Sequence, residues 1–147
     1  MLSWIPIAYI DVRFFAHATE DLNKVVEAVQ CILPARYVDD IVFKRDNLRG
    51  HYGNPISLFE TRIKNREIIK AFFENLTRLN GLDKETLLRE IDLHAANGSL
   101  YIRLDKQAAF QGELKLFAVD PVRVRIRFRK KKTEDIVQIC RELGLLP

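Results

Sequence analysis

Residues 122–129 alternate apolar side chains with arginine, in the order Val-Arg-Val-Arg-Ile-Arg-Phe-Arg. A hydrophobic period of two predicts a β-strand that turns one side toward a core and the other toward solvent. The solvent side then carries a guanidinium group at every second residue, at Arg123, Arg125, Arg127 and Arg129. A chain with such a strand must build a sheet that is covered on one face and open on the other.

Positive charge is concentrated in this part of the chain. Lys130, Lys131 and Lys132 follow the arginines, so residues 122–132 carry seven positive charges and no acid. The whole chain has 24 Lys and Arg against 20 Asp and Glu, which leaves 17 basic and 20 acidic residues elsewhere. A local cationic strip on a sheet face favours a polyanionic partner, and nucleic acid is the first candidate.

Further hydrophobic periodicities predict five more strands and four helices. The strands are expected at residues 7–16, 41–48, 56–63, around 100–104 and around 114–117. The helices are expected from Thr19 to Pro34, from Asn65 to Asn80, from Asp83 past Ile91 and from Thr133 to Gly144, with Thr19, Asp83 and Thr133 as N-caps. Clean alternation and hairpin connections predict an α+β two-layer sandwich, with a mostly antiparallel sheet and helices packed on one face.

Length and composition fit a single domain over residues 1–147. The chain is 48% hydrophobic and 30% charged, with few Gly and Pro, which suits a folded core rather than disorder. The N-terminus lacks a basic region and a small-residue cleavage site, and Asp11 and Arg13 follow too soon for a membrane span. We therefore expect a cytoplasmic protein with no membrane partner.

The open face of the sheet is the first candidate site. Besides the four arginines, other strands would supply Tyr9, Arg13, Phe15, Tyr101 and Arg103. Guanidinium groups pair with phosphates and aromatic rings offer platforms for unpaired bases, as a sheet-based RNA binder requires. The alternative is a solvated face whose arginines pair with Asp11, Glu60 or Asp105. The cations outnumber these acids, so a positive strip survives the pairing.

Two shorter segments are further candidates. The loop His51-Tyr52-Gly53-Asn54-Pro55 combines flexible backbone with His51, Tyr52 and Asn54, which have polar or stacking side chains, although an ordinary turn explains it equally well. In residues 103–110, Arg103, Lys106 and Gln107 would reach a phosphate or a base edge, and Asp105 would equally cap a short helix.

Catalytic and metal-binding patterns are weak. His17, His51 and His94 are the only histidines, and none has metal-ligand spacing such as His-x-x-x-His. No serine or cysteine lies in a nucleophile elbow, and the adjacent acids Asp39 and Asp40 are typical of a solvated turn. We expect no enzyme activity, no catalytic residue, no metal and no cofactor.

Three segments resemble one archaeal family. Residues 51–56 (His-Tyr-Gly-Asn-Pro-Ile) and 103–109 (Arg-Leu-Asp-Lys-Gln-Ala-Ala) are similar to signature stretches of exosome-associated RNA-binding proteins, and residues 15–21 resemble the opening strand-to-helix junction of that family. The three segments occur in the family's order, and the similarity covers nearly the whole chain. The arginine strand is outside the resemblance, and its assignment depends on its own pattern.

The resemblance implies an α+β fold like that of the large-subunit ribosomal protein that contacts 5S RNA, a fold also likened to double-stranded RNA-binding domains. It implies a non-catalytic RNA-binding role in RNA processing, in exosome-linked or ribosome-related pathways. Structured or double-stranded RNA is the favoured partner, with exosome-associated or ribosome-associated proteins as further partners. The alternative function is a scaffold subunit that docks an acidic partner surface. A sheet edge at the arginine strand would also permit a homodimer.

Overall fold

The arginine-rich segment forms strand β6 (Val122–Phe128), which lies inside a six-stranded sheet of order β2-β3-β1-β6-β5-β4. The computed structural model describes residues 6–147. Every neighbouring pair of strands is antiparallel. The other strands are β1 (Ile7–His17), β2 (Lys44–Arg49), β3 (Pro55–Ile63), β4 (Ala95–Ala96) and β5 (Ser99–Leu104).

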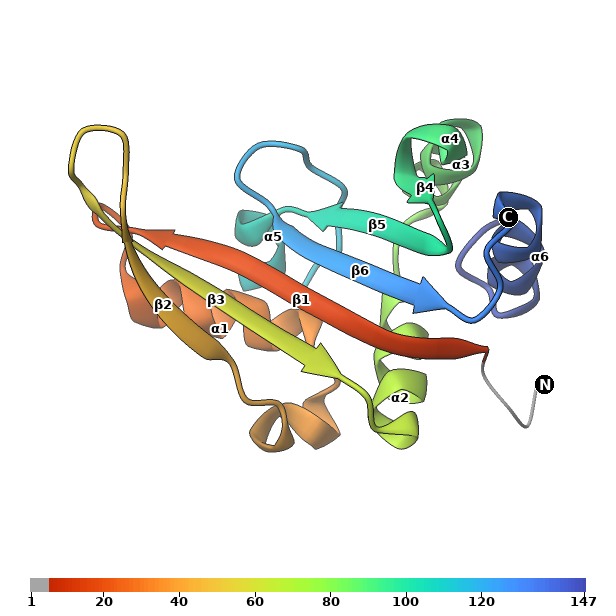
Figure 1. Cartoon of the computed structure of the whole chain (residues 1–147), viewed down its shortest axis with the longest axis horizontal. Coiled ribbons are helices and arrows are strands. Elements are labelled where there is room, and N and C mark those ends of the chain that lie inside the picture. Colours follow the sequence, from red (N-terminus) through yellow and green to blue (C-terminus); the bar gives the residue numbers. More distant parts are fainter. Residues whose placement is uncertain (1–5) are drawn as a thin grey trace.

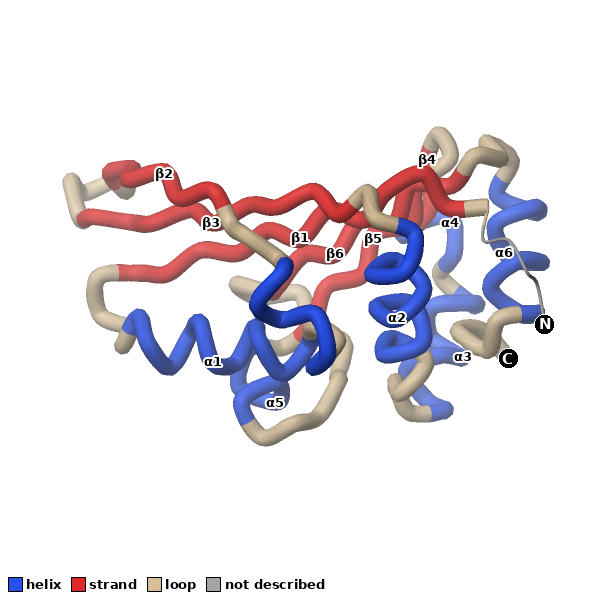
Figure 2. Tube along the Cα trace, turned by 90° about the horizontal axis from the view of Figure 1, so that it is seen from below, coloured by secondary structure: helices blue, strands red, loops and turns tan. Residues whose placement is uncertain are grey.

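Helices cover one face of this sheet and leave the other open. The helices are α1 (Leu22–Ile32), the 3₁₀ helix η1 (Ala35–Asp40), α2 (Arg66–Leu76), α3 (Gly81–Arg89), α4 (Ile91–His94), α5 (Lys106–Phe110) and α6 (Thr133–Glu142). Figure 2 shows α1, α2, α3 and α5 below the sheet and α6 at one end. The prediction of a two-layer α+β sandwich with an antiparallel sheet is therefore confirmed.

The apolar side of β6 fixes how the strand is oriented. All four of its apolar side chains, at Val122, Val124, Ile126 and Phe128, are at most 1% exposed. Burying a side chain of this size stabilises a fold by roughly 1.5–3 kcal/mol relative to exposing it. A slip of one residue in the register would exchange these side chains with the arginines and is strongly disfavoured.

Two expected strands differ from the observed ones. Residues 114–117 form no strand, because the backbone N–H of Leu116 donates to the Asp83 carboxylate and only an isolated bridge links Leu116 to Leu104. The sixth strand is instead the short β4, paired with β5. Strand β2 begins at Lys44 rather than Ile41, since η1 and the segment after it occupy the preceding residues.

The three expected N-caps are also displaced. Asp21, not Thr19, caps α1 by accepting a hydrogen bond from the backbone of Asn23. Asn80 caps α3 through the backbone of Asp83, so Asp83 lies inside the helix it was expected to begin. Thr133 is likewise the first residue of α6. For α1 and α3, more than one Thr, Asp or Asn lies near the helix start, and the sequence alone does not rank them. The N-cap of α6 is Lys132, which makes no side-chain capping hydrogen bond.

The position of β6 also corrects one expectation about assembly. β6 pairs with β1 on one side and β5 on the other, so it is not a sheet edge. The predicted self-association through an edge at the arginine strand is wrong, because the backbone groups of β6 are already paired. Within residues 6–147, no helix combines the length and apolar character needed to cross a membrane.

Candidate nucleic-acid interface

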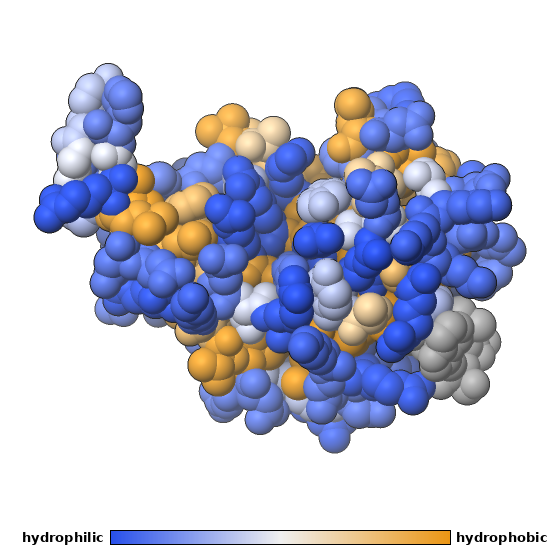
Figure 3. Space-filling model, viewed as in Figure 1, coloured by the Kyte–Doolittle hydropathy of each residue, from blue (hydrophilic) through white to orange (hydrophobic). Residues whose placement is uncertain are grey.

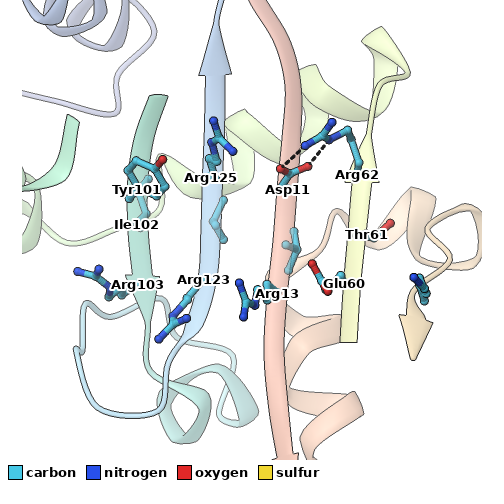
Figure 4. A pocket seen from close by; sticks show the side chains of 13 residues that line it. Asp11, Arg13, Glu60, Thr61, Arg62, Tyr101, Ile102, Arg103, Arg123 and Arg125 are labelled. Carbon is cyan, nitrogen blue, oxygen red and sulfur yellow. Dashed lines mark hydrogen bonds and ion pairs between the residues drawn. The ribbon is translucent and has the colours of Figure 1, made fainter. Parts of the chain in front are cut away.

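Three arginines form a row across the strands on the open face. Arg13 of β1 is opposite Arg123 of β6, and Arg123 is opposite Arg103 of β5. We call these three residues the arginine row (Figure 4). Because neighbouring strands lie about 4.8 Å apart, the whole row starts within roughly 10 Å of backbone. The cations thus gather perpendicular to β6, whereas the sequence predicted a strip along it.

Within the described residues, no acid forms an ion pair with the arginine row. All three side chains are exposed, and within residues 6–147 none of them has an ion pair or a hydrogen bond to a carboxylate. Glu60 of β3 is opposite Arg13 on the far side, but the two do not form an ion pair. Like charges directly opposite each other across a sheet are destabilising. An external anion would relieve that repulsion.

A second row contains a close ion pair. Asp11 of β1 accepts two hydrogen bonds from Arg62 of β3, from Nε to Oδ1 at 2.8 Å and from Nη2 to Oδ2 at 3.0 Å. The hydrogen bond to Asp11 raises the pKa of Arg62 above its usual value, although desolvation acts in the opposite direction. Arg125 lies on the other side of Asp11 but donates from Nε to the Ser99 hydroxyl at 3.0 Å.

Three aromatic rings of the open face each have an arginine beside them. The Arg62 guanidinium carbon lies 4.0 Å from the ring centre of Tyr9. Arg125 lies 5.6 Å from the ring of Tyr101, and Arg13 lies 5.6 Å from the ring of Phe15. Each such contact contributes about 0.5–1 kcal/mol at an exposed site. The rings thus contact guanidinium groups of the open face, and their role as platforms for bases stays a prediction.

The two rows line a groove of about 840 Å³, which is within the size range of ligand-binding clefts. Its charged residues are the cations Arg13, Lys44, Arg62, Arg103, Arg123 and Arg125 and the acids Asp11 and Glu60. These six cations and two acids give the groove a charge of +4, which equals the formal charge of the whole chain. Figure 3 shows that the centre of this face is mostly hydrophilic.

The other predicted cations near β6 lie outside this groove. Arg127 is half-buried and donates from Nη1 to the backbone carbonyl of Asn97. Gly98 is tightly fitted here, because a Cβ on it would lie 2.9 Å from Arg127. Arg129 and residues 130–132 are exposed but follow the end of β6, on the connection to α6.

The predicted loop residues His51, Tyr52 and Asn54 lie at the tip of the β2–β3 hairpin, which projects beyond the sheet (Figure 1). We call residues 50–54 the hairpin tip. All three side chains are exposed, Tyr52 by 87%, and the rings of His51 and Tyr52 meet edge-on at 4.9 Å. Asn54 and Glu60 are six residue steps apart along extended chain, or roughly 20 Å. The hairpin tip and the arginine row are therefore separate surfaces.

Lys106 is in a different environment from the other predicted site residues. It is 9% exposed, and its Nζ donates to the Phe15 carbonyl at 2.6 Å, to Asp120 at 2.8 Å and to Glu20 at 3.4 Å. With its three donors engaged inside the protein, Lys106 is not placed to contact RNA. Gln107 is exposed at the start of α5, in the helical layer.

The same place brings three potential metal ligands together. Ligand atoms of His17, Glu20 and Asp120 lie within 4.8 Å of one another, and His17 Nε2 lies 3.2 Å from Asp120 Oδ1. The ammonium group of Lys106 already lies between the two carboxylates and neutralises them. We assign this cluster a structural role, in which Lys106 takes the place that a metal ion would need.

Two groove residues were absent from the sequence-based set. Arg62 and Lys44 belong to strands whose sequence shows no cationic alternation. Period two does place Glu60 and Arg62 on one face of β3, but their proximity to the arginines of β6 depends on the register of β1 between them. That register is a property of the folded sheet and has no local sequence signal.

Comparison with known proteins gives a family match that includes every residue of the groove. A family model described as RNA binding matches residues 9–128, from β1 to the end of β6. An RNA-binding protein of Pyrococcus abyssi is 36% identical over 142 residues, which cover 90% of each chain.

Two solved structures of DUF54 proteins share the fold. The one from Archaeoglobus fulgidus is 33% identical, with a TM-score of 0.78 over 93% of this chain and 99% of that one. The one from Methanothermobacter thermautotrophicus is 26% identical, with a TM-score of 0.75 over 96% and 98%.

Proposed function

The chain belongs to the RNA-binding family whose model spans residues 9–128, and we propose that it binds RNA, without catalysing a reaction, through the open face of its sheet. The observation that carries this proposal is the arginine row. Its three exposed guanidinium groups lie side by side and, within residues 6–147, have no carboxylate partner. Guanidinium pairs bidentately with phosphate, because two parallel N–H groups match two phosphate oxygens.

The residues of the groove would have graded roles. Arg13, Arg103 and Arg123 would contact phosphates directly, and Arg125 and Lys44 at the margin would add further contacts. Charges that lie outside the groove, on Arg127, Arg129 and Lys130 to Lys132, would attract RNA from a distance, an effect that salt screens. His51, Tyr52 and Asn54 at the hairpin tip would make a second contact. Gln107 faces away from the groove, and Lys106 would stabilise the fold.

The salt dependence of RNA affinity tests the proposal. If about five phosphates are neutralised, the logarithm of the affinity falls with the logarithm of salt concentration at a slope of roughly −4 to −5. Substituting Arg103→Gln and Arg123→Gln together should lower the affinity for a structured RNA at least about 10-fold and make the slope shallower by about 2. Fluorescence anisotropy of a labelled RNA hairpin measures both quantities.

A matched control removes the same charge elsewhere. Lys24 and Arg36 are exposed in α1 and η1, on the covered side of the sheet, and Lys24→Gln with Arg36→Gln should change the affinity less than about 2-fold. Equal losses in the two double variants would show that only net charge matters and that the groove is not the site. Absence of RNA binding by the unmodified chain at low salt would contradict the proposed function itself.

The cationic groove also fits the second candidate, a scaffold subunit that docks an acidic protein surface. Its net charge of +4 within one groove would steer such a partner as well as RNA. Capture of a partner from RNA-processing or ribosome-associated complexes by the tagged chain tests this alternative. Capture that survives nuclease treatment favours protein docking, whereas capture lost with the RNA favours the first function.

A further inference from the structure

We infer that the outer edge of β2 adds an extended acidic segment of a partner protein to the sheet as a further strand. This surface is separate from the arginine row, and the inference goes beyond the proposed function. Three features of the edge carry it, namely unpaired backbone groups, two arginines without acidic partners, and an apolar pocket beside the strand.

The backbone of β2 is unpaired on its outer side. The strand lies at one end of the sheet, next to β3 only (Figure 1). The N–H of Gly50 donates to the carbonyl of Asn54 at 2.7 Å, in line with the register of β2 and β3. Hydrogen-bonded and non-hydrogen-bonded pairs alternate in an antiparallel ladder, so the N–H and C=O groups of Arg45, Asn47 and Arg49 point away from β3. Within the described part of the chain no second strand pairs with β2, and such an edge is a template for another strand.

Arg45 and Arg49 lie on the helix-covered side of the sheet, away from the groove. The Arg45 guanidinium carbon lies 5.5 Å from the ring centre of Phe59, and that ring stacks on the buried Phe14. Arg49 is four residues further along the strand and is therefore on the same side. Both arginines are exposed, and among the described residues neither forms an ion pair. A strand added to β2 would place alternate side chains beside them, where carboxylates are favoured.

An apolar pocket of about 120 Å³ opens on the same side, at the start of β2. Its lining includes Phe43, Phe59 and Val38, and Phe43 is the residue directly before the strand. The pocket is smaller than the roughly 300–1,000 Å³ of small-molecule sites and suits one apolar side chain. Because Phe43 is two residues before Arg45, a side chain of the added strand opposite Phe43 would lie at this pocket.

These features define the chemistry of the partner segment. In strand addition, backbone hydrogen bonds supply affinity, and pockets for alternate side chains supply specificity. An antiparallel partner would face Arg49 with one acid and Arg45 with a second acid four residues later. An apolar residue two positions further on would then reach the pocket beside Phe43.

The charges of the edge disfavour a second copy of this chain as the added strand. Strand β2 carries Lys44, Arg45 and Arg49 against a single acid, Asp46. In a symmetric antiparallel pairing centred on Asn47, Arg45 of each copy would face Arg49 of the other. Like charges directly opposite each other are destabilising, whereas an acidic strand would supply the opposite charge.

Anisotropy titrations of the full chain with labelled peptides of about ten residues test the inference. The probe has the order Glu-Val-Thr-Thr-Glu-Thr-Leu between serine ends, which sets its glutamates opposite Arg49 and Arg45 and its leucine opposite Phe43. One control peptide has glutamine in place of both glutamates, and another has serine in place of leucine. We expect each control to bind at least about 5-fold more weakly than the probe. Hydrogen exchange should show new protection of the Arg45, Asn47 and Arg49 amides when the probe binds.

Variants of the chain test the same contacts from the other side. Arg45→Gln with Arg49→Gln should weaken probe binding about 5-fold. Asn47→Pro removes an outward N–H and should weaken it at least about 10-fold, while an edge strand tolerates proline where the N–H faces solvent. The Arg103→Gln and Arg123→Gln double variant removes the same charge from the groove and should change probe affinity less than about 2-fold.

The outcomes decide the inference independently of RNA binding. Absence of probe binding at low salt, or equal binding of the probe and the glutamine control, overturns it. An equal loss in the two double variants would place the probe in the groove and overturn it as well. A dimer of the unmodified chain in light scattering, dissociated by Asn47→Pro, would show that a second copy occupies the edge and would also overturn the inference. If Asn47→Pro fails to fold, the peptide controls and hydrogen exchange decide without it.

Discussion

Lys106 and the arginine row are both cationic, and both contact or include residues of β1. Among the described residues, acids of the fold pair with Lys106 but not with the arginine row. The ammonium of Lys106 is 9% exposed and is held by Glu20, Asp120 and the carbonyl of Phe15. The guanidinium groups of Arg13, Arg103 and Arg123 are exposed and, within residues 6–147, have no acidic partner. Lys106 is thus neutralised by acids of its own fold, whereas the proposed function has the arginine row neutralised by an external anion.

Lys106→Met should give the largest effect, a loss of about 2–3 kcal/mol of unfolding free energy. Removing one partner of a fully buried pair costs about 3–5 kcal/mol. The loss is smaller here because the Glu20 and Asp120 side chains are 29% and 37% exposed. RNA affinity should change less than about 2-fold, since Lys106 is not placed to reach a phosphate. Urea unfolding and anisotropy measure the two effects separately.

Two variants control this prediction. Lys24→Met removes an exposed lysine of α1 and should change stability by less than about 0.5 kcal/mol. Adding Asp120→Asn to Lys106→Met should recover part of the loss, because it removes one of the two carboxylates left without a cation. A Lys106→Met protein of full stability and weakened RNA binding would reverse the assignment of Lys106.

The next prediction tests whether RNA contacts the arginine row, which runs across the strands, or the arginines that follow one another along β6. Arg103→Gln should weaken RNA binding about 5-fold and make the salt slope shallower by about 1, because it removes one phosphate contact. Arg127→Gln should weaken binding less than about 2-fold, since its Nη1 is engaged with the carbonyl of Asn97 and the side chain lies outside the groove. A larger loss from Arg127→Gln would show that RNA follows β6.

The sequence predicted what depends on local periodicity. The alternation of residues 122–128 defined β6, the buried side of the strand and the outward direction of Arg123, Arg125 and Arg127, since a period of two specifies both faces. It predicted the antiparallel sheet and the open face for the same reason. The start of α2 beside Asn65 also agrees, because the Asn65 side chain accepts from the backbone of Glu67 and Ile68.

The sequence did not predict features that arise from long-range pairing. The sequence predicts that Lys106 reaches a phosphate or a base edge. Its partners Phe15 and Glu20 lie 91 and 86 residues away, and only the fold brings them together. The same limit applies to Arg62, which enters the groove through the register of β1 and β3. The contact between Arg125 and Tyr101 follows the same rule, since the pairing of β6 with β5 brings the two residues together. A residue's neighbours on the next strand are invisible to a local pattern.

Asp11→Asn removes an acid from the groove and should strengthen RNA binding, whereas the arginine substitutions weaken it. Asp11 is the one acid of the groove that forms a close pair, and its loss raises the groove from +4 to +5. We expect affinity to rise about 2–3-fold at low salt and the salt slope to steepen. Stability should fall by less than about 1 kcal/mol, because pairs this exposed contribute little. Glu27→Gln in α1 is the matched control and should leave affinity unchanged. Weaker binding by Asp11→Asn would mean that Asp11 orients Arg62 for the ligand.

The smallest predicted effect is a gain in unfolding free energy, whereas Lys106→Met should cause a loss. Arg123 is flanked by Arg13 and Arg103 on its neighbouring strands, so Arg123→Gln should raise the unfolding free energy by about 0.3 kcal/mol in the absence of RNA. The gain comes from removing like-charge repulsion and should vanish near 1 M salt, where the screening length is about 3 Å. Urea unfolding at low and high salt measures it, with Arg36→Gln as the control. A loss of stability instead would show that Arg123 already has a stabilising partner inside the fold, and the distinction between the two groups of cations would fail at its central residue.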